Sequence, residues 1–293
     1  MASYDYVAPT TTDEVVRLLA EHGEDAHVIA GGASLLLMLQ QQLIVPSLLV
    51  GLRGVEGLGS IREISDGGLE IGATATHRSV ERSPAVRAYA PTLAEAVAQV
   101  GTVRVRNQGT MGGNLAHADP AQDPPPILLA LDASVEALGP DGPRSIPIDE
   151  LFVDVFETSL RPAEIITAVR LPARPAGSAA RYVKFLPRSK DDYATVAIAV
   201  SGVADADGRW WRVRVAAGAA GPVPLRIRDA EAALEGQAFG DDDVERAAEA
   251  VGAAVDPIPD HRGSAEYKRE MAMVWTRRAL RDLAAPRGER MDA

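Results

Sequence analysis

The order of polar and apolar positions near the amino end predicts a helix followed by a strand. Residues 11–14, Thr-Thr-Asp-Glu, have the pattern of a capping box, in which the first side chain accepts a backbone N–H and the acidic one reaches back. The helix should run to about Glu21 and stop at Gly23. The apolar run 27–30 that follows is too short for a helix and is bounded by glycines, which favours a buried strand.

Residues 26–52 contain no Asp, Glu, Lys or Arg, a composition that also occurs in membrane spans. Gly31-Gly32, three glutamines and Pro46 interrupt the segment well short of the roughly 18 apolar residues that a span requires. The pattern instead predicts a buried strand–helix–strand unit. Its helix should cover about 35–41, capped by Ser34, and its second strand should lie at 48–50.

The next part of the chain mixes short apolar runs with helical stretches. A strand is predicted at 68–76, where alternate positions share one apolar face, and a mostly helical stretch at 84–100. The apolar run 127–131 has no polar alternation, so periodicity alone leaves helix and strand open. We interpret it as a helix.

Residues 171–178, Leu-Pro-Ala-Arg-Pro-Ala-Gly-Ser, have a composition typical of a domain boundary. We therefore expect two domains, 1–172 and 178–285, the first divided into subdomains of about 1–55 and 56–172. The second should contain a small sheet backed by helices. Its strands are expected at 181–185, 195–203 and 210–216, one helix beginning at the acidic run 241–243, and another over about 264–283.

Composition narrows the function classes. The 293 residues carry 30 Lys and Arg against 41 Asp and Glu, a formal net charge of −11 that argues against a nucleic-acid binder. Hydrophobic residues make up 46%, as in ordinary globular proteins. With no cysteine, the chain cannot form a disulfide, a thiolate nucleophile, Cys-ligated zinc or its own iron–sulfur cluster. Residues 1–12 show no signal-peptide pattern, so a cytoplasmic protein is expected.

A first glycine loop, Ala-Gly-Gly-Ala-Ser-Leu at 30–35, lies between a predicted strand and a predicted helix. Free backbone N–H groups and the helix dipole at such a junction attract anions, so a diphosphate would fit. The glycines would let the ligand approach the backbone, and the Ser34 hydroxyl could donate to a phosphate. The alternative is a tight turn with Ser34 as an ordinary N-cap. The loop is neither a dinucleotide G-x-G-x-x-G motif nor a P-loop.

A second glycine cluster, Arg-Asn-Gln-Gly-Thr-Met-Gly-Gly-Asn at 106–114, suggests that one extended ligand contacts both loops. It leads into a proline-rich segment that holds Asp119 and Asp123, whose carboxylates could accept from ribose or ribityl hydroxyls. Two alternatives stay open. Asp119 can simply form a turn, and His117 with both aspartates can form a metal site, although we favour no metal.

Four segments, in order along the chain, resemble the FAD-binding medium subunit of the molybdenum hydroxylases, such as aerobic carbon monoxide dehydrogenase, and the corresponding flavin domain of xanthine dehydrogenase. The second segment is by itself highly specific, with the pattern R-N-x-G-T-x-G-G-N-L-A-x-A-D-P-x-x-D. A minor departure is Leu37, where the family frequently has Pro. The four segments are 30–35, 106–123, 184–196 and 263–280.

The resemblance implies an α+β protein with an FAD-binding fold of the vanillyl-alcohol-oxidase type in two subdomains, plus a C-terminal domain with a small antiparallel sheet. FAD, held non-covalently, would stretch across the two subdomains. By position, Asp123 would accept from a sugar or ribityl hydroxyl, Ile166 would lie near the flavin and Lys184 would contact the isoalloxazine. The pyrophosphate and neighbouring groups would be held by Val28, Ile29, Ala30, Gly31, Gly32, Ala33, Ser34, Leu35, Gly101, Thr110, Gly113 and Asn114.

Lys184 also has a physical rationale, since a fixed cation stabilises the negative charge that a reduced flavin develops. The alternative is a surface lysine on an edge strand. In the same segment, Arg188 and Asp192 would either lie near the flavin edge or pair with each other.

Isolated histidines and tryptophans suggest no further chemistry. His22, His77 and His261 have no companions at metal-ligand spacing, so solvated or capping roles are expected. Trp210 and Trp211 are neighbours in a predicted strand, so one ring should face the core and the other the surface.

The function that the resemblance implies is electron transfer, with no catalytic residue or metal ligand in this chain. A large partner subunit would oxidise the substrate at molybdopterin, and a small one would relay electrons through [2Fe-2S] clusters. FAD in this chain would pass them to an external acceptor, within a heterotrimer. The main alternative is a stand-alone FAD oxidase or dehydrogenase of the same fold, for which the sequence offers no convincing base. A scaffold without cofactor is disfavoured because the glycines are intact.

Overall fold

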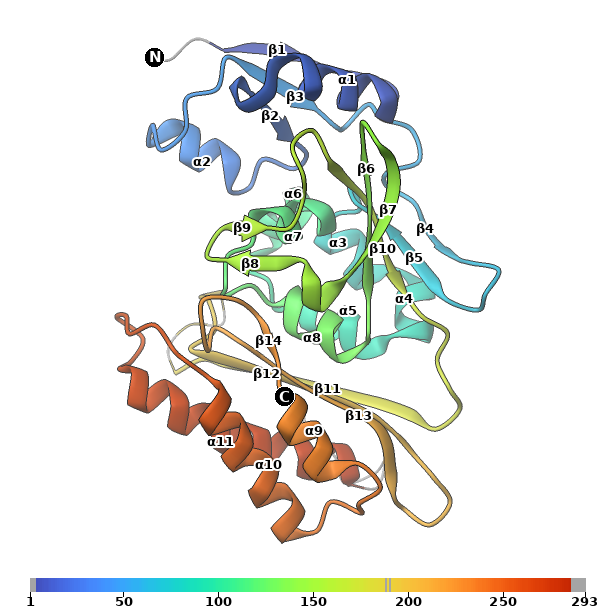
Figure 1. Ribbon diagram of the computed structural model, residues 1–293, viewed down its shortest axis with the longest axis vertical. Coiled ribbons are helices and arrows are strands. Elements are labelled where there is room, and N and C mark those ends of the chain that lie inside the picture. Colours follow the sequence, from blue (N-terminus) through green and yellow to red (C-terminus); the bar gives the residue numbers. More distant parts are fainter. Residues whose placement is uncertain (1–3, 188, 190, 286–293) are drawn as a thin grey trace.

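The computed structural model describes residues 4–187, 189 and 191–285, which Figure 1 shows as three stacked units. The amino-terminal unit is a parallel three-stranded sheet of order β1-β3-β2 with two α-helices and a 3-10 turn over Gly23–Asp25. Its main elements are β1 (Asp5–Val7), α1 (Thr12–His22), β2 (Ala26–Ile29), α2 (Leu35–Gln40) and β3 (Leu48–Gly51).

The predicted start and end of α1 are confirmed. The Thr11 side chain accepts from the Glu14 N–H at 3.3 Å, and Gly23 ends the helix at a φ of 55°. One detail differs from a capping box, because the Glu14 carboxylate accepts from the backbone of Thr10 and not of Thr11. Helix α1 buries Val15 and other apolar residues against the sheet.

The predicted strand–helix–strand unit is confirmed as β2, α2 and β3, but not its uniform burial. β3 is the central strand and is fully buried, whereas β2 is an edge strand that is only partly buried after Ala26. In α2, the side chains of Leu36 and Leu37 are 44% and 55% exposed. The prediction failed for α2 because the rest of the described chain covers only one face of this short helix.

The middle unit contains a five-stranded antiparallel sheet of order β4-β5-β10-β6-β7. Its strands are β4 (Ile61–Glu63), β5 (Leu69–Gly72), β6 (Ser134–Gly139), β7 (Gly142–Pro147) and β10 (Ile165–Leu171), with a small hairpin of β8 (Phe152–Asp154) and β9 (Glu157–Thr158). Its helices are α3 (His77–Arg82), α4 (Pro84–Tyr89), α5 (Pro91–Ala98), α6 (Val103–Gln108), α7 (Met111–His117), α8 (Pro124–Ala130) and a 3-10 turn, Ile148–Glu150.

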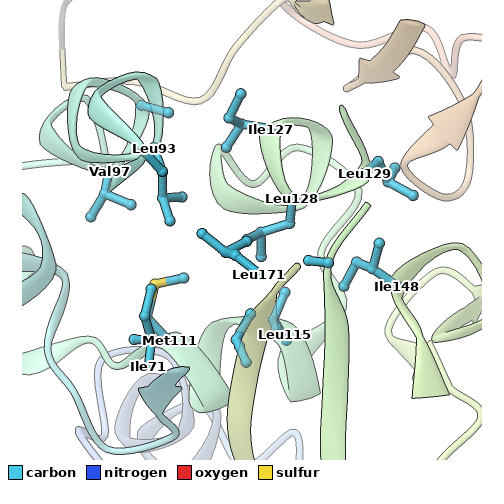
Figure 2. Close-up of a cluster of buried hydrophobic side chains, with 14 of the residues drawn as sticks. Ile71, Leu93, Val97, Met111, Leu115, Ile127, Leu128, Leu129, Ile148 and Leu171 are labelled. Atoms are coloured by element: carbon cyan, nitrogen blue, oxygen red, sulfur yellow. The ribbon is translucent and has the colours of Figure 1, made fainter. Parts of the chain in front are cut away.

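The three predictions for this unit are confirmed with changed boundaries. The strand expected at 68–76 is the shorter β5, and the helical stretch 84–100 is divided into α4 and α5 because Pro91 starts a new helix. The ambiguous run 127–131 belongs to helix α8, whose seven residues are all buried. Figure 2 shows residues of α8 among side chains from β5, α5, α7 and β10. A helix buried on every side has no polar face, which is why its sequence lacks a period.

The C-terminal unit is a four-stranded antiparallel sheet of order β11-β12-β13-β14, with helices on one face, as predicted. The paired tryptophans also behave as expected, because Trp210 is 6% exposed and Trp211 is 46% exposed. The elements are β11 (Ser178–Phe185), β12 (Val196–Ala204), β13 (Trp210–Gly218), β14 (Leu225–Arg226), α9 (Arg228–Leu234), α10 (Asp241–Ala254) and α11 (Ala265–Ala284).

The four-stranded sheet is covered on both faces (Figure 1). Along β12, Val196 and Ile198 pack into the core beneath α10 and α11, while Ala197 and Ala199 pack into the core of the middle unit with α5 and α8. The small alanine side chains let the sheet approach α8 closely. The whole is the α+β fold with small antiparallel sheets that was predicted. Among the described helices, none is long and apolar enough to cross a membrane.

Candidate functional site

A pocket of about 570 Å³ lies where the three units meet. Its walls come from the loop after β2, from α2, from the segment between α5 and α7, and from β10 and β11. All fifteen residues nominated from the sequence line this one pocket: Val28, Ile29, Ala30, Gly31, Gly32, Ala33, Ser34, Leu35, Gly101, Thr110, Gly113, Asn114, Asp123, Ile166 and Lys184. Residues more than 150 positions apart in the sequence are thus brought together.

The two glycine loops, which we call the glycine side (residues 28–35 and 109–114), touch each other through their backbones. A Cβ on Gly31 would lie 1.7 Å from the Gln108 carbonyl oxygen, and one on Gly112 would lie 2.6 Å from the Cβ of Ala73. Packing therefore requires both glycines, Gly31 where the first loop meets the second and Gly112 where α7 meets Ala73. The approach of a ligand to the first loop stays a prediction. Gly32 is needed for another reason, its φ of 75°.

The first loop presents free donors. Within the described residues, the backbone N–H groups of Gly32, Ala33 and Ser34 donate to no protein acceptor. The Ser34 hydroxyl makes no capping bond to α2, so the interpretation of Ser34 as an ordinary N-cap is wrong. Because α2 has only six residues, the free amides of this loop would contribute more than a helix dipole to the anion binding that we expect of it.

The second loop uses part of its polar groups internally. The Thr110 side-chain oxygen accepts from the Gly113 N–H at 3.2 Å and so caps α7, which leaves the hydrogen of the Thr110 hydroxyl available to a ligand. Asn114, on the same helix, has a buried Oδ1 without a hydrogen-bond partner in the described chain.

Another part of the pocket carries the charged groups of Asp123 and Lys184. Together with Tyr182, which bonds to Asp123 without lining the pocket, they are called the charged side below. The Lys184 ammonium lies 3.0 Å from Asp123 Oδ2 and donates to the Gln99 carbonyl at 2.8 Å, while the Tyr182 hydroxyl donates to Asp123 Oδ1 at 2.7 Å. The Lys184 side chain is 1% exposed, so the alternative of a surface lysine is wrong, although β11 is an edge strand.

Burial dominates the electrostatics of the charged side. It raises the pKa of Asp123, an effect that the Lys184 charge and the hydrogen bonds from Tyr182 and Lys184 oppose. Burial, together with the neighbouring carboxylate, raises the pKa of Tyr182 well above its usual value, so this hydroxyl keeps its proton. The Tyr182 hydroxyl therefore remains a hydrogen-bond donor to Asp123.

Three polar side chains in the pocket were missed or misassigned from the sequence. His27 Nδ1, His77 Nδ1 and Gln122 Oε1 are buried and, within the described chain, have no hydrogen-bond partner. The solvated or capping role expected for His77 is wrong, because the side chain is 2% exposed and burial, aided by Arg106, lowers its pKa to about 4. The place of His77 in the pocket depends on its packing against Gly109. The sequence around an isolated histidine does not encode that contact.

The remaining candidates have local partners. Asp119 Oδ1 accepts from the Ala121 N–H at 2.9 Å, as the turn alternative expected. Asp192 lines the pocket and pairs with Arg262 at 2.7 Å, whereas Arg188 lies outside the described residues. Among the described side chains, no group of three or more His, Cys, Asp or Glu residues is placed to hold a metal ion, and this applies also to His117, Asp119 and Asp123.

The comparisons with known proteins agree with this geometry. Residues 2–174 match the family described as the FAD binding domain in molybdopterin dehydrogenase, and residues 181–283 match the CO dehydrogenase flavoprotein C-terminal domain. Fold and pocket together thus define an FAD-binding flavoprotein.

Two of the curated relatives are dehydrogenase subunits. The chain is 38% identical over 293 residues to the 6-hydroxypseudooxynicotine dehydrogenase complex subunit alpha of Paenarthrobacter nicotinovorans, covering 99% of this chain and 98% of that protein. It is 35% identical to the carbon monoxide dehydrogenase medium chain of Hydrogenophaga pseudoflava, covering 94% and 96%.

A solved structure of the Hydrogenophaga pseudoflava carbon monoxide dehydrogenase, which lacks the Mo-pyranopterin moiety of the molybdenum cofactor, superposes with a TM-score of 0.91 and 38% identity, covering 95% of this chain and 96% of that one. This chain belongs to the family of FAD-binding medium subunits of molybdenum hydroxylases. The resemblance, the fold class and FAD as the cofactor are therefore confirmed.

Proposed function

We propose that this chain passes electrons from the [2Fe-2S] clusters of a partner subunit, through its FAD, to an external acceptor. The observation that carries the proposal is the single pocket that gathers all fifteen nominated residues with unpaired amides and buried unpaired polar atoms. Buried polar atoms without protein partners are costly, so they indicate a polar ligand. FAD is long and polar, and it carries hydrogen-bond acceptors for the unpaired amides as well as donors for the unpaired buried atoms. It therefore fits the pocket.

The glycine side would hold the diphosphate on its free amides, with the hydroxyls of Ser34 and Thr110 as further donors. The charged side would serve the ribityl and isoalloxazine part. Asp123 would accept from a hydroxyl, Ile166 would pack near the ring, and the Lys184 ammonium would stabilise negative charge on it. FAD, when bound, accepts and releases electrons singly or in pairs.

Two features support a role within an assembly. The chain has no cysteine, so clusters must be supplied by a [2Fe-2S] subunit and molybdopterin by a large subunit. Exposed large apolar residues also gather on segments that border the pocket, which is typical of interaction surfaces. They include Leu36, Leu37, Leu43, Val45, Val103, Val105, Val153, Val155 and Phe156.

The domain division is part of this proposal. We assign 1–172 to FAD binding, with subdomains of about 1–55 and 56–172, and 178–285 to the C-terminal domain. The gap between β10 and β11 and the two adjacent family matches support it. The pocket nevertheless needs both domains, because Lys184 reaches Asp123 across the boundary.

The isolated chain tests the function. We expect purified protein to be yellow, to release FAD into the supernatant on acid precipitation, and to be reduced by artificial donors while oxidising no molybdenum-hydroxylase substrate. Co-expressed with the neighbouring subunits, it should elute as a heterotrimer. A chain that elutes alone with FAD and oxidises a small organic substrate unaided would replace our proposal with the stand-alone oxidase. Flavin that stays with the precipitate would contradict non-covalent binding.

A further inference from the structure

Strand β11 sends alternate side chains to opposite faces. Val183 and Phe185 pack against the core beneath the C-terminal helices, whereas Tyr182 and Lys184, two residues apart, face the first domain. Both reach the carboxylate of Asp123. Tyr182 does not line the pocket, so any effect it has on a ligand must pass through Asp123.

Asp123 occupies an unusual place at the start of α8. An aspartate at the N-cap normally accepts from the backbone N–H groups of the first turn. Here the next three residues are Pro124, Pro125 and Pro126, which have no N–H, and the Asp123 side chain makes no capping bond. The carboxylate is therefore available to donors from elsewhere, and in this fold they come from β11.

The two donors on β11 bond to different oxygen atoms of the Asp123 carboxylate. Tyr182 occupies Oδ1 and Lys184 occupies Oδ2, so rotation of the carboxylate would break one bond or the other. Each carboxylate oxygen accepts about two hydrogen bonds, so each keeps one acceptor site. Since Asp123 lines the pocket, at least one of these sites is within reach of a ligand there.

We propose that Tyr182 is a positioning residue of the cofactor site: its hydroxyl fixes the Asp123 carboxylate in the orientation and ionised form that accept a hydroxyl group of FAD. The inference rests on the proposed assignment of Asp123 to a sugar or ribityl hydroxyl. It adds that the C-terminal domain shapes the FAD site through a residue that touches no cofactor.

The charges around Asp123 define the expected pH dependence. Facing it are Tyr182 and Lys184 from β11, while Tyr193, in the loop after β11, senses the charges of both Asp119 and Asp123. Helix α5 contributes the Gln99 carbonyl, and α8 contributes no titratable side chain. The hydrogen bond from Tyr182 lowers the pKa of Asp123, so its removal raises that pKa further.

The test is the FAD dissociation constant of the full-length chain, stripped of flavin, measured by fluorescence from pH 5 to 9. For Tyr182→Phe we expect about tenfold weaker binding at pH 8, equal to about 1.4 kcal/mol. We also expect the loss of affinity on acidification to begin at higher pH than in the wild type. The matched control is Tyr89→Phe, which removes a hydroxyl bonded to the Gly67 and Pro172 carbonyls, outside the pocket.

The outcomes distinguish the proposed function from the positioning role of Tyr182. A wild-type chain that binds no FAD contradicts the proposed function. A Tyr182→Phe chain that binds FAD like Tyr89→Phe, or more weakly with an unchanged pH profile, overturns only the positioning role. If Tyr182→Phe does not fold, Asp123→Asn is decisive, because we expect it to abolish the acid-dependent loss of affinity, and a retained loss overturns the inference.

Discussion

The glycine side and the charged side belong to one site but depend on different parts of the chain. On the glycine side the groups that we propose for the ligand are mainly the backbone amides of residues 32–34, whose positions follow from local conformation. On the charged side they are buried side chains, and Asp123 bonds to residues 59 and 61 positions away. Damage to the first should cost mainly cofactor affinity, whereas damage to the second should also cost stability.

The largest expected effect is on the charged side. Lys184→Met leaves a buried carboxylate without its cation, which should lower the free energy of unfolding by about 3–5 kcal/mol. Urea denaturation measures this. The matched control is Arg277→Met, which breaks a more exposed pair with Glu245 and should cost less than about 1 kcal/mol. Equal losses in the two variants would show that the buried pair of Lys184 and Asp123 adds no more to stability than an exposed pair.

His77 sharpens the comparison because it is a buried titratable group packed beneath the glycine side. Its pKa is about 4 in the folded chain against 6.5 when free, so the unfolded chain binds more protons between these values. The contribution of His77 to the free energy of unfolding is therefore fully present above pH 6.5. It should fall by about 3 kcal/mol as the pH drops to 4. His77→Gln should flatten this part of the profile, whereas the exposed His22→Gln should leave it intact. If stability depended on pH in the same way in both variants, the acid sensitivity would not come from His77.

Gly32→Val tests whether the glycine side binds cofactor or is only a turn. The new side chain would be strained at a φ of 75° and would press on Leu36 and Ile29, displacing the amides of the loop. We expect FAD affinity to fall about a hundredfold, close to 2.7 kcal/mol. Gly57→Val, also at positive φ but in open space away from the pocket, should share the strain and keep its flavin. Unchanged flavin content in Gly32→Val would identify the loop as a plain turn.

The smallest expected effect concerns one hydroxyl. Because the Ser34 hydroxyl makes no capping bond, Ser34→Ala should not change stability but should weaken FAD binding up to tenfold. Ser83→Ala is the opposite case, since its hydroxyl caps α4 by accepting from Val86 N–H. That variant should lose about 1 kcal/mol of stability and no affinity. The comparison fails if both variants change the same quantity.

What could be predicted from the sequence follows the same division. Glycine loops next to apolar runs carry local signals, so the interpretation of residues 30–35 and 106–114 as ligand-binding loops needed only neighbouring residues. The individual site residues were assigned by the family resemblance. The roles of His77 and Tyr182 depend on contacts with Gly109 and Asp123, which no local period encodes. The strand β10 was not predicted either, since its pairing partners β5 and β6 lie far from it in the sequence.

The burial of a helix could not be predicted from its apolar composition. Helix α2 reads as uniformly apolar, yet it is only half covered in the described structure. Helix α8 has a similar composition and is wholly buried. We interpreted both segments as helices, at 127–131 without support from periodicity, but the sequence did not specify what covers them. Coverage depends on tertiary packing and, for α2, on neighbours outside this chain in our proposal.

The contact of Lys184 and Tyr182 with Asp123 also constrains the order in which the protein can be made. A ribosome that has released residues 1–174 has completed both glycine loops, but neither partner of Asp123 has emerged as a folded strand. Until β11 is made, Asp123 lacks both of these partners and the pocket lacks Lys184. We therefore expect a chain truncated after residue 174 to bind FAD more weakly than the full-length chain, so that stable flavin loading would follow translation of the four-stranded sheet.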